Sequence, residues 1–156
     1  MTMDLGDLLA ADGIVPTLKV KSKKQALQEL ATRAASVTGL EFREIYDTLL
    51  QRERLGSTGL GRGVAIPHVK FRSLRNIVCI FARLEEAIDF DSLDGQPVDL
   101  IFLLLAPEHA SGDHLKALAR ISRIVREPSM LEKLRKAPST NELRTVLSAA
   151  VAPHAA

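Results

Sequence analysis

The chain has few of the residues that mark specialised classes of protein. Its 156 residues include no tryptophan, one tyrosine, five phenylalanines and a single cysteine. One cysteine cannot form an internal disulfide, so the sequence indicates a hydrophobic core in a reducing compartment. Cys79 lies in the apolar run 77–81, where we expect a small buried side chain. The scarcity of aromatic rings also disfavours stacking with single-stranded nucleic acid.

Long apolar runs and a strong charge of one sign are also lacking. The longest apolar run, residues 100–106, has the length of a strand, whereas a membrane span needs roughly 18 residues. The first residues carry neither the positive nor the apolar region of a signal peptide. The formal net charge is only +2, smaller than nucleic-acid binding usually requires. We therefore expect a cytoplasmic protein that neither inserts into a membrane nor binds nucleic acid.

The positive charges are nevertheless loosely clustered along the chain. Two groups stand out: Lys19, Lys21, Lys23 and Lys24, followed by Arg62, Lys70, Arg72 and Arg75. One interpretation is an ordinary solvated surface. The other is the steering of an acidic or phosphorylated partner.

The pattern of the whole chain indicates one α/β domain over residues 1–156, with a core at about 5–150 and a tail at 151–156. Two strands, expected at 77–84 and 98–105, are apolar on both alternating faces, so the sheet is predicted to be sandwiched between helices. The turn cluster 91–97 between them is compatible with antiparallel neighbours or with a wider connection.

The remaining elements follow from local signals. Ser22 offers an N-cap with Gln25 as its partner, and the helix should run to Gly39. Pro16 places the extended segment 14–20 at a sheet edge. The other expected elements are a short turn at 5–10, a helix at 41–54 that carries Arg52, a β segment at 64–66, and helices at 113–126, 129–136 and 140–149.

The most informative segment is 52–68, which places four glycines and two hydroxyls before Pro67-His68. Glycine permits positive φ, so that amide N–H groups can turn towards an anion, while proline fixes its own φ. The spacing of 56–61 matches a Walker A loop, but Arg62-Gly63 replaces the Lys-Ser/Thr pair and an extended segment follows. A dinucleotide fingerprint fits equally poorly, because the loop leads into a strand.

Covalent chemistry at the histidine fits this segment better. A neutral imidazole has a lone pair that can attack a phosphoryl donor in line. The negative charge of the transferring group requires positioned N–H donors and cations. The candidates are the amides of Gly59, Gly61 and Gly63, the hydroxyls of Ser57 and Thr58, and the guanidinium of Arg52, although each also has an ordinary structural explanation.

His114 is the natural second histidine of such a site. It follows a plausible N-cap region at 111–113, so it should occupy the first helical turn, where the macrodipole disfavours its charged form. A neutral imidazole there could hydrogen-bond a phosphoryl oxygen or hold His68. His109 and His154 are expected at the solvated surface. The histidines lack the spacing of a metal site, so we expect neither a metal nor any other cofactor.

These residues resemble a known family, enzyme IIA of the fructose/mannitol type in the phosphoenolpyruvate-dependent phosphotransferase system, including its nitrogen-regulatory branch. The resemblance extends over most of the chain and is carried by Arg52-Glu53, Gly56-Ser57-Thr58-Gly59, Gly61, Gly63 and Val64-Ala65-Ile66-Pro67-His68, with support from Asp113-His114-Leu115.

The resemblance implies a mixed β-sheet flanked by helices and a phosphohistidine at His68. It also implies that His114 and Arg52 are active-site neighbours, that Nε2 is the attacking nitrogen, and that a phosphorylated histidine-containing carrier protein is the donor. The glycine loop looks closest to the nitrogen-regulatory branch. A sugar-transport enzyme IIA that serves a IIB domain, and a non-catalytic docking module of the same fold, are the alternatives.

Two residues depart from the family pattern. Arg62 stands where asparagine is frequent, and Val69 stands where a small residue commonly follows the histidine. Neither change removes a group needed for phosphoryl transfer. Both bear on the choice of partner and not on the chemistry.

Overall fold

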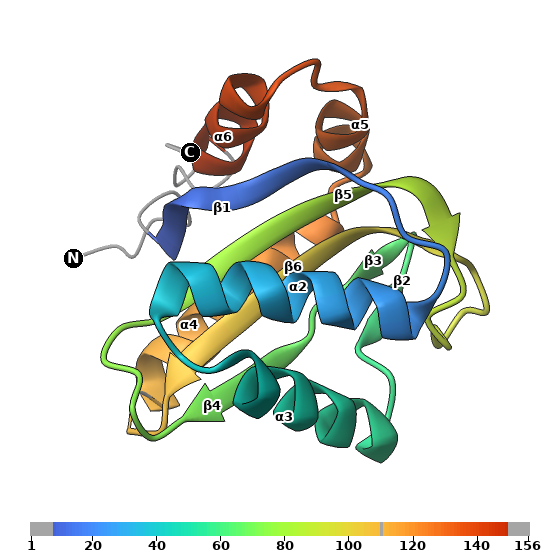
Figure 1. Ribbon diagram of the computed structural model, residues 1–156. Helices are drawn as coiled ribbons and strands as arrows, with labels where there is room; N and C mark the ends of the chain where they lie inside the picture. The colour runs from blue at the N-terminus through green and yellow to red at the C-terminus, as the bar shows by residue number, and fades with distance from the viewer. Residues whose placement is uncertain (1–7, 110, 150–156) are drawn as a thin grey trace.

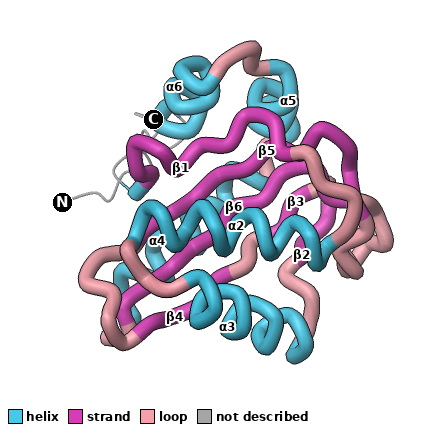
Figure 2. The backbone as a smooth tube through the Cα atoms, in the orientation of Figure 1, coloured by secondary structure: helices cyan, strands magenta, loops and turns pink. Residues whose placement is uncertain are grey.

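The computed structural model describes residues 8–109 and 111–149, and shows a mixed β-sheet between two layers of helices (Figures 1 and 2). The elements of this part of the chain are β1 (Leu9–Leu18), α2 (Lys23–Thr38), α3 (Phe42–Leu55), β2 (Gly59–Gly61), β3 (Val64–Ala65), β4 (His68–Phe71), β5 (Val78–Ile88), β6 (Val98–Pro107), α4 (Ser111–Val125), α5 (Pro128–Lys136) and α6 (Thr140–Ala149). The predicted α/β sandwich is confirmed.

Strand β6 organises the six-stranded sheet, in which five strands follow the order β1-β5-β6-β3-β2 and the sixth, β4, also pairs with β6. Strand β6 pairs antiparallel with β5, which settles the connection through the turn cluster 91–97. On its other side it pairs in parallel with β3 and then with β4. The two short strands therefore follow one another along the same edge of β6, separated by Ile66 and Pro67.

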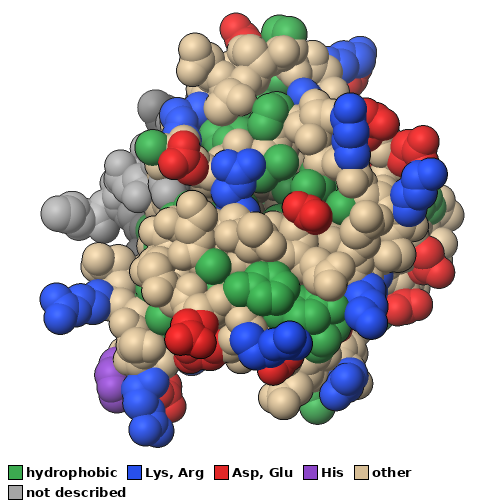
Figure 3. All heavy atoms as spheres, in the orientation of Figure 1, with side chains coloured by type: hydrophobic (Ala, Val, Ile, Leu, Met, Phe, Trp, Pro, Cys, Tyr) green, Lys and Arg blue, Asp and Glu red, His purple; other side chains and the backbone are tan. Residues whose placement is uncertain are grey.

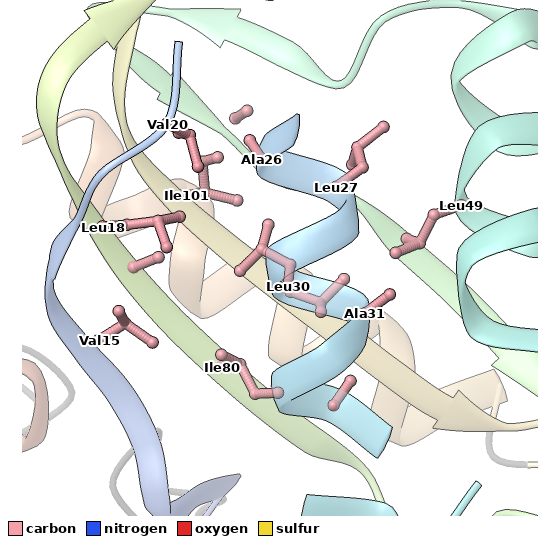
Figure 4. Close-up of a cluster of buried hydrophobic side chains, with 14 of the residues drawn as sticks. Val15, Leu18, Val20, Ala26, Leu27, Leu30, Ala31, Leu49, Ile80 and Ile101 are labelled. Atoms are coloured by element: carbon pink, nitrogen blue, oxygen red, sulfur yellow. The ribbon is translucent and has the colours of Figure 1, made fainter. Parts of the chain in front are cut away.

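The sheet is buried on both faces because β6 is apolar from Leu100 to its end. Ile101, Leu103 and Leu105 belong to a hydrophobic cluster with α2 and α3. Leu100, Phe102 and Leu104 belong to a second cluster that includes apolar side chains of α4, α5 and α6. Figure 4 shows part of the first cluster, where Leu30 of α2 lies over the sheet near Ile80 and Ile101. This is the doubly buried strand that the sequence predicts.

The helix signals are confirmed in detail for α2. The Gln25 amide donates to Ser22 Oγ (3.1 Å), and Gly39 ends the helix with φ +80°. The expected helices 41–54, 113–126 and 129–136 are observed with ends shifted by one or two residues. The helix at 140–149 has the expected bounds.

The prediction for the N-terminal part was wrong in one respect. A short turn was expected at 5–10, but Leu9 and Ala10 begin β1, where Leu9 pairs with Cys79 of β5. Backbone pairing with a neighbouring strand outweighs the local turn tendency. The edge position expected from Pro16 is confirmed. Residues 1–7 and the expected tail at 151–156 lie outside the described residues.

Candidate functional site

His68 is the first residue of β4 and follows Pro67 directly. The Pro67 carbonyl accepts a hydrogen bond from the Leu104 amide of β6 (2.9 Å), which fixes the chain just before the histidine. The imidazole is half-buried, and its Nδ1 lies 2.8 Å from the Ile66 carbonyl oxygen. A carbonyl oxygen can only accept a hydrogen bond, so Nδ1 carries the hydrogen. The lone pair of the neutral ring is therefore on Nε2.

His114 lies beside His68, as the sequence predicts. It is in the first turn of α4, its side chain is 9% exposed, and the two ring centroids are 5.6 Å apart at an interplanar angle of 43°. Its Nε2 is buried and has no hydrogen-bond partner among the described residues. Buried polar atoms are rarely left without a partner in native proteins. This nitrogen is thus available to a group bound between the two histidines.

The pKa of His114 is lowered from its ordinary value. Burial is the main cause, and the electrostatic interactions with His68 and Lys70 act in the same direction. The macrodipole at the start of α4 is a further reason to disfavour the imidazolium. His114 is therefore held neutral and can donate a hydrogen bond without the desolvation cost of a buried charge.

Arg52, the expected active-site cation, lies in the last turn of α3. Its guanidinium Nη1 donates to the carbonyl oxygen of Gly56 (2.9 Å), the residue that ends the helix. In this conformation the arginine caps its own helix. Its contact with a phosphoryl group stays a prediction that requires this side chain to turn.

The hydroxyls of Ser57 and Thr58 are both engaged inside the protein. Ser57 Oγ donates to the Phe90 carbonyl, and the buried Thr58 hydroxyl donates to Glu53 Oε2. Glu53 Oε1 also accepts from the Thr58 amide (3.2 Å). A role for these hydroxyls as phosphoryl donors stays a prediction, and it requires the present hydrogen bonds to be exchanged.

The glycines expected to form a phosphate loop form a β-hairpin instead. β2 and β3 are antiparallel, and the turn between them has φ +58° at Arg62 and +82° at Gly63. Positive φ at both central residues is typical of the type I′ hairpin turn. Asparagine tolerates this conformation better than arginine, which explains physically why asparagine is frequent in the family at the position of Arg62.

The anion held by this hairpin belongs to the protein itself. The Arg62 amide donates to Asp94 Oδ2 (3.0 Å). Hydrogen bonds from the Gln96 and Arg62 amides hold the pKa of Asp94 below its usual value. A Cβ added at Gly61 would lie 3.1 Å from this same carboxylate, and the Gly59 amide donates to Ser57 Oγ (3.0 Å). Gly59, Gly61 and Gly63 thus serve the hairpin here, and phosphoryl binding by their amides stays a prediction.

The sequence alone did not place Lys70 near His68. It was noted as one cation of a cluster, but it is two residues after His68 in the same strand. Alternate residues of a strand face the same side. The strand at 68–71 was not predicted; the spacing His-x-Lys would have placed Lys70 only if this strand had been expected.

Neither a metal centre nor a membrane span was found in the parts of the chain that the structure describes. No group of three or more histidine, cysteine or acidic side chains within 8–109 and 111–149 could hold a metal ion. None of the described helices is both long and apolar enough to cross a membrane. Cys79 is buried, and burial raises the pKa of its thiol to about 12.

The fold and the site define the class of the protein as an α/β sandwich with a mixed sheet and two neighbouring histidines, His68 and His114. Residues 7–150 match the family described as phosphoenolpyruvate-dependent sugar phosphotransferase system, EIIA 2, and the chain belongs to this family. A nitrogen regulatory protein of Bradyrhizobium diazoefficiens is 56% identical over 146 residues, which cover 94% of this chain and 95% of the relative.

Solved structures agree with this assignment. The nitrogen regulatory protein IIA-Ntr of Neisseria meningitidis is 38% identical, with a TM-score of 0.88 over 92% of this chain and 98% of the other. The mannitol enzyme IIA of Escherichia coli, solved in complex with phosphorylated enzyme IIB, shares the fold at 19% identity. Its TM-score is 0.76 over 91% of this chain and 99% of the other.

Proposed function

We propose that this protein carries a phosphoryl group on Nε2 of His68, accepted from the phosphohistidine of a carrier protein, and that its phosphorylation state serves nitrogen-linked regulation. The observation that carries the proposal is the hydrogen bond between His68 Nδ1 and the Ile66 carbonyl, which leaves the Nε2 lone pair for attack. The relatives named nitrogen regulatory proteins support the regulatory part. A cytoplasmic location belongs to the same proposal.

The transfer balances without any further reactant. His68 Nε2 uses its lone pair to form a new P–N bond, while the P–N bond of the donor breaks and its electron pair returns to the donor imidazole. If the donor ring carries a proton on its other nitrogen, it leaves as a neutral imidazole. His68 then becomes a phosphoimidazolium whose Nδ1–H faces the Ile66 carbonyl. Because the bond moves between similar imidazoles, the equilibrium should lie near unity.

His114 stabilises the charge of the group in transit. Its Nε2 is buried, has no partner among the described residues and belongs to a ring that is held neutral. A hydrogen bond from this nitrogen to a phosphoryl oxygen would give it a partner. Removal of one donor that acts on transition-state charge typically slows an enzyme about 100-fold to 1000-fold. Arg52 and the loop donors are the further candidates for this role.

The test is intact-mass spectrometry after incubation with phosphoenolpyruvate, enzyme I and the carrier protein. We expect one acid-labile phosphoryl group on the wild type and on His109→Ala, which changes an exposed histidine. We expect none on His68→Ala, and a rate reduced about 100-fold for His114→Ala. A folded wild type that stays unmodified would refute the proposal and favour a docking module of the same fold.

Sugar transport is the second candidate function, because a structure with this fold is a mannitol enzyme IIA bound to a phosphorylated enzyme IIB. In that case the phosphoryl group would pass from His68 to a IIB protein. The two functions differ in one measurement, the rate at which purified phosphorylated protein loses its phosphate to candidate fructose- and mannitol-type IIB proteins. Rapid transfer to one of them would contradict a purely regulatory role.

A further inference from the structure

Lys70 projects from the same face of the sheet as His68. β4 has alternating exposure: His68 is half-buried and Lys70 is exposed, whereas Val69 and Phe71 are buried. Val69 and Phe71 pack into the cluster formed with α2 and α3. His68 and Lys70 therefore face the α4 side, where His114 lies, and β4 is at an edge of the sheet with α4 behind it (Figure 1).

The ammonium of Lys70 is uncommitted in this conformation. Across residues 8–109 and 111–149 it takes part in no hydrogen bond or ion pair, and its side chain is exposed. Two other cations near this part of the chain are engaged. Arg72 pairs with Glu108 at 3.4 Å, and Arg52 donates to the Gly56 carbonyl. Lys70 is thus a cation that an arriving anion can use without breaking an existing contact.

The charge of Lys70 also reaches the histidine pair. Its field lowers the pKa of His114, which lies on a different element, α4. Two residues of a strand span about 6.6 Å, and a lysine side chain is long and flexible with three N–H donors. From this position the ammonium can reach the oxygens of a group bound to His68 Nε2.

We propose that Lys70 is a further phosphoryl-binding residue, whose ammonium contacts the oxygens of the phosphoryl group on His68 and stabilises the phosphorylated state. This inference rests on the proposed function. Lys70 forms no covalent bond in the transfer and neither gains nor loses a proton. Its contribution is the attraction of one positive charge for a group that carries up to two negative charges.

The experiment measures the equilibrium constant of transfer between the phosphorylated carrier protein and the purified protein. The two are mixed without enzyme I or phosphoenolpyruvate, and the four species are quantified by intact-mass spectrometry. This constant depends on how stable the phosphorylated and free forms are, whereas a residue that only helps docking changes the rates alone. We expect Lys70→Met to lower the constant about twofold to fivefold, the range of an exposed charge pair.

Two variants and one condition complete the design. Lys70→Arg should keep the wild-type constant, because it keeps the charge. Lys24→Met removes the same charge from an exposed position on α2 and should also leave the constant unchanged. At about 1 M salt, where the Debye length is about 3 Å, the difference between the wild type and Lys70→Met should shrink.

The outcomes separate this inference from the proposed function. A wild type that accepts no phosphoryl group would overturn both. If the wild type and a folded Lys70→Met are phosphorylated on His68 with the same equilibrium constant, Lys70 does not stabilise the phosphorylated state and only this inference is wrong. Equal losses for Lys70→Met and Lys24→Met would also contradict it, since they would show an effect of net charge.

Discussion

A main-chain carbonyl selects the reactive nitrogen of His68. The 2.8 Å contact between Nδ1 and the Ile66 oxygen fixes one tautomer of the neutral ring. The same contact would stabilise the positive charge that the ring acquires when Nε2 is phosphorylated. His114, with its buried and unpartnered Nε2, is the complementary group on the other side. At this scale the chemistry depends on the tautomer of one histidine and the neutrality of the other.

The lowered pKa of His114 predicts how stability depends on pH. Below the ordinary histidine pKa of about 6.5, the unfolded chain binds a proton at this residue while the folded protein resists it. The free energy of unfolding should therefore decrease as the pH falls through this value, until the lowered folded pKa is reached. His114→Gln removes this dependence.

Urea denaturation of the wild type and His114→Gln from pH 8 to pH 5 measures the effect. The difference in free energy of unfolding between them should be constant at the alkaline end. As the pH falls below about 6.5, the free energy of unfolding of the wild type should decrease relative to that of His114→Gln. A difference that stays constant over the whole range would show that folding does not shift this pKa.

The β2–β3 hairpin binds an anion with a backbone amide, but that anion is a side chain of the protein and not a phosphoryl group. The sequence predicts amides that turn towards an anion, and the Arg62 amide does bind a carboxylate, that of Asp94. The Arg62 side chain donates to the Val125 and Arg126 carbonyls at the end of α4. Arg135 of α5 donates to the Arg62 carbonyl (2.7 Å). The hairpin thereby ties the sheet to two helices.

Gly63 should tolerate substitution poorly for this reason. Its φ is +82°, and an added Cβ would lie 2.5 Å from Arg135 Nη2 and 2.8 Å from Asp99 Oδ1. These two atoms belong to an ion pair that would have to separate. Gly39 is the matched control, because its φ is +80° and nothing lies within 4 Å of the added atom.

We expect Gly39→Ala to lower the free energy of unfolding by about 1 kcal/mol, the cost of the backbone conformation alone. Gly63→Ala should cost about 1 to 3 kcal/mol more. Chemical denaturation of both variants measures this. Equal losses would indicate that Arg135 and Asp99 move aside without cost.

The whole molecule depends on a sheet that has no polar face. Helices α2 and α3 cover one side, and α4, α5 and α6 cover the other. Arg83 of β5 adds a polar connection by donating to the Pro16 carbonyl of β1 (2.9 Å) and to the Ala137 carbonyl that follows α5 (2.7 Å). On the face over α2 and α3, acidic and basic side chains are interspersed, so this face has no strong charge of one sign (Figure 3).

Stability should accordingly depend on β6 more than on surface leucines. Leu103 is fully buried in the cluster with α2 and α3, whereas Leu93 is 81% exposed in the turn before β6. Leu103→Ala should lower the free energy of unfolding by about 2 to 5 kcal/mol, because a cavity remains. Leu93→Ala should change it by less than about 0.5 kcal/mol.

Denaturation curves of the two leucine variants, compared with the wild type, provide the measurement. Phosphorylation of His68 should persist in Leu103→Ala wherever the variant is folded, because Leu103 faces the side of the sheet opposite α4. Similar losses of stability for both substitutions would contradict the arrangement of two helical layers on one apolar sheet.

Much of the fold and part of the site could be predicted from the sequence. The caps of α2, the strands with two apolar faces and the edge position of β1 depend on signals within a few residues. His114 in a first helical turn near His68 was also expected, and the two rings are 5.6 Å apart. The start of β1 was missed because the pairing of Leu9 with Cys79 joins residues far apart in the chain.

The sequence by itself determined which residue types surround the histidine, because glycine, proline and strand periodicity act through local backbone conformation. Only the tertiary structure decided how they are used. In the structure, Nδ1 of His68 donates to the Ile66 carbonyl, and His114 is buried. The hydroxyl of Ser57 donates to the Phe90 carbonyl, and that of Thr58 donates to Glu53. Lys70 lies on the same face of β4 as His68 and forms no hydrogen bond or ion pair with the described residues. The burial of His114 and the contact between Ser57 and Phe90 join residues far apart in the chain, which meet only when the layers pack.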